Sequence, residues 1–148
     1  MLYKSSKQIM DRTTRELKPE FTFETDGERM VWRQYFDDGA YNTRYFSRSQ
    51  MCIILHVHYI EDKNPDRLQK LVDSGELYDY LTDLYDRVED AVEEQKSLWV
   101  ENDEKYRAIV VNDPVGAAGI VNMYEMQARE VVYEAMIYDQ EIYHKSLY

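Results

Sequence analysis

The strongest pattern along this chain is a repeat of mainly apolar residues in its second half. From residue 77 the repeat steps by four and three residues, at Leu77, Leu81, Leu84, Val88, Ala91, Gln95 and Leu98. Similar steps recur after Asp113-Pro114, at Val121, Tyr124, Ala128, Val131, Ala135, Tyr138 and Ile142. Such spacing places side chains on one face of an α-helix. The sequence therefore predicts long helices over 76–98 and 114–145 that pack antiparallel along two apolar stripes.

The first half of the chain carries strand and turn signals instead. Asp26-Gly27 lies between two runs rich in Phe, Thr, Val, Trp and Tyr, which is typical of a β-hairpin. A second turn signal, Asp37-Asp38-Gly39, precedes another aromatic run. We expect an antiparallel β-meander over 20–46 that is separate from the helices or touches them only by an edge. Trp32 and Tyr35 should lie on opposite faces of it, one buried and one exposed.

The segments on either side of the meander carry signals for both helix and strand. Residues 4–17 predict a short helix. After Ser47, a plausible N-cap, the segment 47–62 has β-branched residues that favour a strand and a length that favours a helix. Asn64-Pro65 then predicts the start of a helix over 65–73, and Gly75 its end.

Together these elements predict an α+β fold that is mainly α, with a small N-terminal antiparallel β-meander followed by a bundle containing two long antiparallel helices. At 148 residues the chain has the size of one domain, so we expect a single domain over 1–148. Within it, 20–46 is the meander and 47–148 is the helical region.

One stretch of the helical region resembles a known family. Residues 59–81 contain a helix, Asn64-Pro65, a second helix, then Ser74-Gly75-x-Leu77 and Tyr80-Leu81. This order resembles TnpV-type proteins of transposons and other mobile elements, and the similarity returns at Asn112-Asp113-Pro114-Val115 and at positions up to Tyr138. The resemblance implies a helical core, favours helix for 47–62, and implies residence on a mobile element or phage. It implies no catalytic residues.

The charge of the chain is concentrated in one segment. The formal net charge is −11, and residues 76–104 hold 11 Asp and Glu but only two basic residues, Arg87 and Lys96. Opposite the apolar stripe of the 76–98 helix, six carboxylates form a line of their own, which we call the acidic stripe: Glu76, Asp79, Asp83, Asp86, Asp90 and Glu93. Two interpretations stay open, a solvated face and a surface that binds a basic partner.

Composition and motif spacing limit which ligands, metals and reactions are expected for this chain. A sequence pI near 4.7 argues against direct binding of nucleic acid or anionic membranes. The single cysteine, Cys52, lies in an apolar run and excludes a disulfide within the chain. His56-x-His58 would form a metal pair only in a strand, and Glu141-x-x-His144 is only half of a di-iron motif. We therefore expect no enzyme activity, cofactor or metal. The apolar runs are too short to span a bilayer, which favours the cytoplasm.

Two functions are consistent with these observations. The first is a non-enzymatic binding protein of a phage or mobile element, whose acidic stripe occupies a basic, nucleic-acid-binding surface of a partner protein. A DNA-mimic inhibitor of a defence nuclease or CRISPR effector would work in this way. The second is an accessory structural protein of a transposition or recombination complex, which docks through aromatic and apolar surfaces. The oligomeric state stays open.

Overall fold

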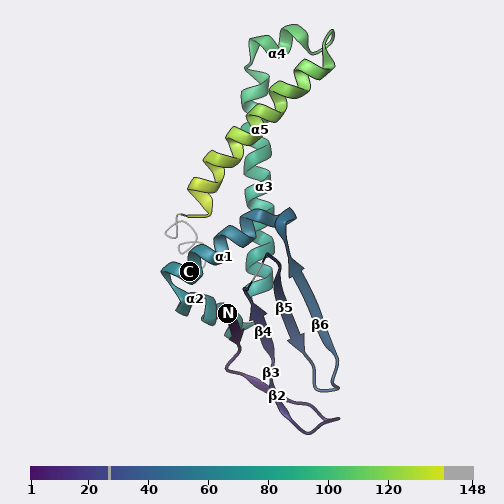
Figure 1. Cartoon of the computed structure of the whole chain (residues 1–148), viewed down its shortest axis with the longest axis vertical. Helices are drawn as coiled ribbons and strands as arrows, with labels where there is room; N and C mark the ends of the chain where they lie inside the picture. The colour runs from purple at the N-terminus through teal and green to yellow at the C-terminus, as the bar shows by residue number, and fades with distance from the viewer. Residues whose placement is uncertain (27, 139–148) are drawn as a thin grey trace. The chain divides into compact units, whose positions relative to one another are not determined.

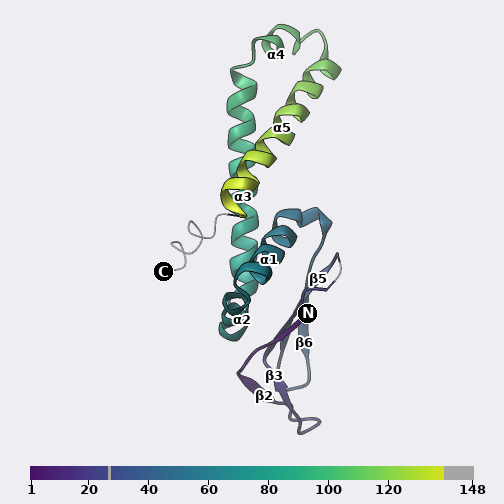
Figure 2. The same ribbon diagram turned by 60° about the vertical axis from the view of Figure 1, so that its left-hand side comes forward.

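A computed structural model describes residues 1–26 and 28–138 (Figures 1 and 2). Their contacts group into two compact units, Met1–Tyr85 and a second that begins at Asp86. The boundary falls inside the longest helix, α3 (Leu77–Glu101). The order of elements, strands first and helices after them, confirms the predicted α+β, mainly α fold class.

The first unit opens with an antiparallel sheet. β1 (Leu2–Lys4), β4 (Phe21–Glu24), β5 (Met30–Tyr35) and β6 (Tyr41–Phe46) pair in the order β1-β4-β5-β6. β4, β5 and β6 confirm the meander predicted over 20–46. Its first predicted turn includes Gly27, which lies outside the described residues. At the second turn Gly39 has a φ of +87°, a conformation that favours glycine.

The short helix predicted over 4–17 is wrong. Lys4 ends β1, which pairs with β4, and β2 (Gln8–Met10) pairs with β3 (Leu17–Pro19) in a separate hairpin. In β1, Tyr3 pairs with Phe23 and is buried. A strand partner some twenty residues away decides the conformation here, and local propensity does not report it.

The inner face of the sheet builds the core of this unit together with α1 (Met51–Lys63), α2 (Pro65–Ser74) and the start of α3. Its buried side chains are Tyr3, Phe23, Met30, Trp32 and Phe46. The Phe46 ring lies 5.7 Å from that of Tyr78 in α3, and the hydroxyl of Tyr3 donates a hydrogen bond to Glu61 in α1 at 2.9 Å. Burial and this bond raise the pKa of Tyr3 to about 12. The prediction that the meander stands apart from the helices is therefore wrong.

The alternation predicted for β5 agrees with the structure only in part. Trp32 is buried on the inner face, while Tyr35 on the opposite face is half-buried and not exposed. The ring of Tyr41, its neighbour on β6, lies 5.8 Å from the ring of Tyr35 and covers part of it.

The segment 47–62, whose local sequence favours both strand and helix, is helical, as the family resemblance implies. A 3-10 turn (η1, Arg48–Gln50) leads into α1, whose buried residues are Cys52, Ile53, Ile54, His56, Val57 and Ile60. This burial outweighs the strand preference of the β-branched residues. Ser47 is the N-cap residue of this turn, as predicted, and its backbone is extended, but its side chain makes no capping hydrogen bond.

The residues that begin and end α2 are those predicted from the sequence. The Asn64 side chain caps the helix by accepting a hydrogen bond from the backbone of Arg67 at 3.3 Å, and Pro65 occupies the first turn. Gly75 ends the helix with a φ of +75°. A Cβ at Gly75 would lie 2.5 Å from Cζ of Phe21, so the glycine is also required by the packing of the sheet on α2.

The second unit is a helical hairpin made by the end of α3, α4 (Glu104–Ile109) and α5 (Pro114–Met136). Asp113 caps α5 by accepting a hydrogen bond from the backbone of Gly116 at 3.0 Å. Arg129 in α5 pairs with Glu89 at 2.8 Å, and the ring of Tyr124 lies tilted against that of Trp99 with centroids 6.0 Å apart. These pairings run in opposite directions along the two helices, which confirms the antiparallel arrangement. Residues 139–145 of the predicted helix lie outside the described residues.

The apolar stripes are partly displaced from their predicted positions. Leu77, Leu81, Leu84 and Val88 are buried as expected, but Val92 follows them in place of Ala91, and Leu98 is 53% exposed. In α5, Ala128 of the predicted stripe is buried, but Val132 is buried in place of Val131, which is 53% exposed. A straight α-helix drifts by about 20° per heptad relative to steps of four and three. The predicted positions therefore rotate out of the interface with distance along the helix.

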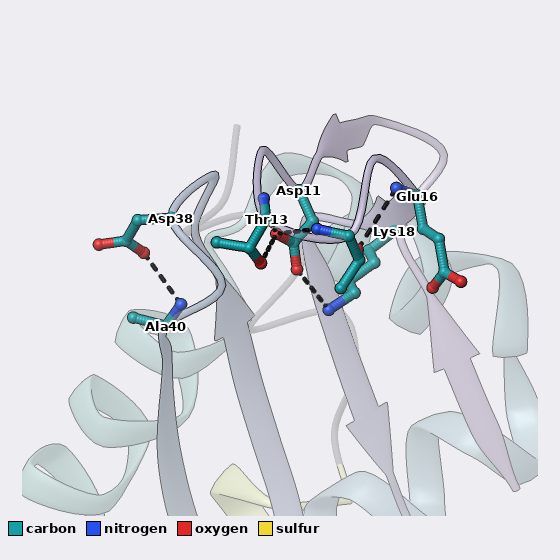
Figure 3. Close-up of polar contacts among 7 residues, drawn as sticks. Asp11, Thr13, Glu16, Lys18, Asp38 and Ala40 are labelled. Carbon is teal, nitrogen blue, oxygen red and sulfur yellow. Dashed lines mark hydrogen bonds and ion pairs between the residues drawn. The ribbon is translucent and has the colours of Figure 1, made fainter.

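A buried carboxylate organises the tip of the β2–β3 hairpin (Figure 3). Asp11 is 1% exposed, and its oxygens accept hydrogen bonds from Lys18 at 2.8 Å and from the Thr13 hydroxyl and amide at 2.6 and 2.8 Å. The Lys18 ammonium, with the two Thr13 donors, holds the pKa of Asp11 well below its usual range. The carboxylate is therefore a structural group.

We expect this carboxylate to contribute to acid sensitivity. Below about pH 4 the unfolded chain protonates Asp11 while the folded chain does not, so stability is lost as pH falls. Asp11→Asn should flatten the decline in the free energy of unfolding between about pH 4 and 2, measured by urea titration at each pH. The exposed Glu16→Gln should keep the parent slope. Equal slopes for the parent and Asp11→Asn would contradict this assignment.

Candidate functional site

The acidic stripe lies on the solvent side of α3. Its six residues, Glu76, Asp79, Asp83, Asp86, Asp90 and Glu93, are all exposed, while Leu77, Leu81, Leu84 and Val88 on the opposite helix face are buried. The unit boundary divides the stripe, so that Glu76, Asp79 and Asp83 belong to the first unit and the other three to the second. The predicted helix face is thus present and accessible in each unit.

The carboxylates of the stripe differ in their local partners. Glu93 pairs with Lys96 at 2.6 Å, and this bond lowers the pKa of the Glu93 carboxyl. Within the described residues, Asp79, Asp86 and Asp90 form no ion pair with a basic side chain. These three keep their negative charge toward solvent. A basic partner would meet them without first displacing an intramolecular cation.

In the second unit, contacts on the neighbouring face of α3 hold the stripe outward. The guanidinium of Arg129 binds Glu89 through both nitrogens, at 2.8 and 3.2 Å, and pairs with Glu125 at 3.6 Å. The bond to Glu89 raises the pKa of Arg129, so this cation is permanently charged. Tyr124 donates a hydrogen bond to Asp103, which also caps α4. Glu89 is thereby used internally, whereas Asp86 and Asp90 on either side of it are not.

The candidate metal and nucleophile positions take other roles. His56 is 1% exposed and its Nε2 lies 2.7 Å from the Tyr80 hydroxyl, whereas His58 is exposed on the other side of α1 with Nδ1 4.0 Å from Glu61. Cys52 is buried. In the described residues no cluster of three or more His, Cys, Asp or Glu has the arrangement of a metal site. Glu141 and His144 lie outside those residues.

One surface was not anticipated from the sequence. The outer face of the sheet carries basic and aromatic side chains at alternate positions, including Arg33 and Tyr35 on β5 and Tyr41 and Tyr45 on β6. The signal was available, because the strands of the meander were predicted and their side chains alternate between two faces. The net charge of the chain does not reveal this basic surface, because a net charge sums over surfaces of opposite sign.

Comparison with protein-family models, with curated proteins and with solved structures found no match to this chain. The resemblance to TnpV-type proteins therefore stays a prediction. Among the helices of residues 1–26 and 28–138, none combines the length and the apolar character needed to cross a bilayer.

Proposed function

We propose that this chain is a non-enzymatic binding protein whose acidic stripe occupies a basic, nucleic-acid-binding surface on a partner protein. The observation that carries the proposal is the exposure of all six carboxylates on the helix face opposite the buried stripe. A partner therefore reaches them without any change in the packing of α3.

The arrangement of the charges favours a binding role over solubility alone. Like charges three and four residues apart on a helix cost a few tenths of a kcal/mol per pair, and a helix face built for solubility usually interleaves Lys with Glu. Steps of three and four residues raise successive carboxylates by about 5 Å along the axis. To a basic groove on a partner protein, a row of anions at this spacing resembles the charges of a nucleic-acid backbone.

The biological setting belongs to the same proposal. The resemblance of residues 59–138 to TnpV-type proteins supports a phage or another mobile element as the source. In that setting a row of carboxylates that competes with DNA or RNA would act as an inhibitor of a defence nuclease or of a CRISPR effector. Competition for one groove needs no catalytic group on this chain.

The test is capture of the partner from host lysate by the immobilised chain and by its variant Asp79→Lys/Asp83→Lys/Asp86→Lys. We expect the variant to lose the captured protein while it stays folded, because all three positions are exposed. Capture by the parent should weaken steeply with added salt, and short duplex DNA should elute the partner.

The matched control for this test is Glu16→Lys/Asp62→Lys/Glu134→Lys, which makes the same change in net charge at exposed positions away from the stripe. It should capture as the parent does. Equal capture by the stripe variant near physiological salt would leave the stripe as solubilising charge and contradict the proposal.

A second candidate function, an accessory structural protein of a transposition or recombination complex, is favoured by an apolar groove in the second unit. The groove lies between α3 and α5, and its apolar lining includes Ala91, Leu98, Val131 and Ala135. Leu98 and Val131 are each 53% exposed. Docking there should resist salt, and Leu98→Asp should abolish it while the acidic-stripe variant should not.

A further inference from the structure

The sheet of the first unit has one face that its helices leave open. α1 and α2 lie on the inner side of the sheet, and among the described residues of this unit no helix lies on the other side (Figure 2). The strand register defines the outer face by alternation, and its central row runs from Lys4 through Thr22 and Arg33 to Thr43, one residue from each strand. Neighbouring strands lie about 4.8 Å apart, so the backbone positions of Lys4 and Arg33 are about 10 Å apart across the row.

The cations of this row are available to a ligand. Lys4 is exposed and Arg33 is half-buried, and neither forms an ion pair within the described residues. The threonine hydroxyls beside them donate and accept hydrogen bonds. Such a row suits a phosphate-bearing chain, because guanidinium and ammonium groups bind phosphate oxygens with charge-assisted hydrogen bonds.

Exposed aromatic rings lie on both sides of Thr43, at the β6 end of this row. Tyr41 on β6 is 58% exposed and lies beside Tyr35, its partner on β5. Tyr45, four residues further along β6, is 48% exposed, and the guanidinium of Arg29 lies 4.2 Å from the centre of its ring. Four residues of strand span about 13 Å, so the two exposed rings accept separate flat groups with Thr43 between them.

The charge of the outer face is opposite to that of the chain. Its basic residues are Lys4, Lys18, Arg29 and Arg33. Its acidic residues include Glu24 and also Glu20, which is paired with Lys7 at 3.3 Å. Lys18 is held by Asp11, which leaves three cations for a ligand. A groove of about 480 Å³ opens on this face beside Thr22 and Tyr35. A local excess of cations on a protein of net charge −11 selects for an anionic ligand.

We propose that the outer face of this sheet binds single-stranded nucleic acid, with bases stacked on Tyr41 and Tyr45 and backbone phosphates held by Lys4 and Arg33. Stacked rings beside cations distinguish this ligand from an acidic peptide, which has no flat groups to place on the tyrosines. They also distinguish it from duplex DNA, whose base faces are hidden in the helix. The proposal goes beyond the function proposed for the acidic stripe and uses none of its residues.

The test is fluorescence anisotropy of the full chain with labelled 12-nucleotide oligo(dT) and oligo(U), at about 50 and 200 mM salt. Two cations that neutralise phosphates, Lys4 and Arg33, predict a loss of affinity of about sevenfold between these two salts. Lys4→Glu/Arg33→Glu should weaken binding by at least about tenfold. Tyr41→Ala, at an exposed position that the fold does not require, should weaken it by at least about fivefold.

The control variant is Lys105→Glu/Arg107→Glu, which makes the same change in net charge at exposed residues of α4. It should bind the oligonucleotides nearly as the parent does. Three outcomes would overturn the proposal: no binding at 50 mM salt, equal affinity for polyglutamate of the same charge, or tighter binding of duplex DNA than of the single strands. Parent-like binding by Tyr41→Ala and by the double reversal would overturn it as well.

Discussion

Replacing Leu84 with Asp is expected to abolish the cooperative unfolding of this protein or to lower its thermal midpoint by roughly 10 °C or more. Leu84 is 1% exposed on the buried face of α3. The substitution removes the apolar contacts of a core leucine, which costs about 2–5 kcal/mol, and places a carboxylate where no partner was provided. That cost is a large fraction of the 5–15 kcal/mol that stabilises a typical domain. Thermal unfolding followed by circular dichroism measures it.

Val131→Asp is the matched variant, because the same change is made at a position of the second predicted stripe that the structure places at the surface. Val131 is 53% exposed, so the new carboxylate stays hydrated and the midpoint should change little. Equal unfolding of both variants would favour the regular stripe expected from the sequence over the displaced one in the structure. A stable Leu84→Asp would contradict the buried face itself.

The second large effect is expected for Gly75→Ala, which should destabilise the protein by about 2–4 kcal/mol. Gly75 ends α2 with a φ of +75°, where a residue with a Cβ is strained by about 1–2 kcal/mol. The new methyl group would also lie 2.5 Å and 2.7 Å from ring atoms of Phe21, so the ring or the end of α2 has to move. Urea unfolding should show a lower midpoint with an unchanged slope.

Gly119→Ala provides the control for this glycine. Gly119 lies inside α5, and a Cβ there has no neighbour within 4 Å. The same chemical change should therefore stabilise the protein by about 0.5–1 kcal/mol, since alanine loses less backbone entropy in a helix. A neutral Gly75→Ala would show that Phe21 yields easily and that the sheet is loosely packed on α2.

The candidate site shows how far periodicity carries a functional prediction. A helix places residues that are three and four apart on one face, so the exposure of Asp79 and Asp86 followed from the burial of Leu77 and Leu84. The basic outer face of the sheet did not follow in the same way. It needs the register that brings Lys4 of β1 into line with Arg33 of β5 through Thr22, and net charge carries no trace of this alignment.

Local sequence determined where several helices of this protein begin and end. Asn64-Pro65, Gly75 and Asp113-Pro114 begin or end helices where they were expected, because capping side chains, a ring-locked φ and a missing Cβ act within a few residues. The strands of the meander follow from turn signals between aromatic and β-branched runs, and the two long helices follow from the spacing of their apolar residues.

Only the tertiary structure decided which faces those elements bury and which partners they choose. Residues 51–63 form a helix against their local preference because Ile53, Val57 and Ile60 are buried in the core of the first unit. β1 exists because β4 pairs with it, and the meander shares its core with the helices through contacts such as Phe21 with Gly75. These outcomes depend on residues far apart in the chain, whose contacts compensate the entropy of ordering only after the chain has folded.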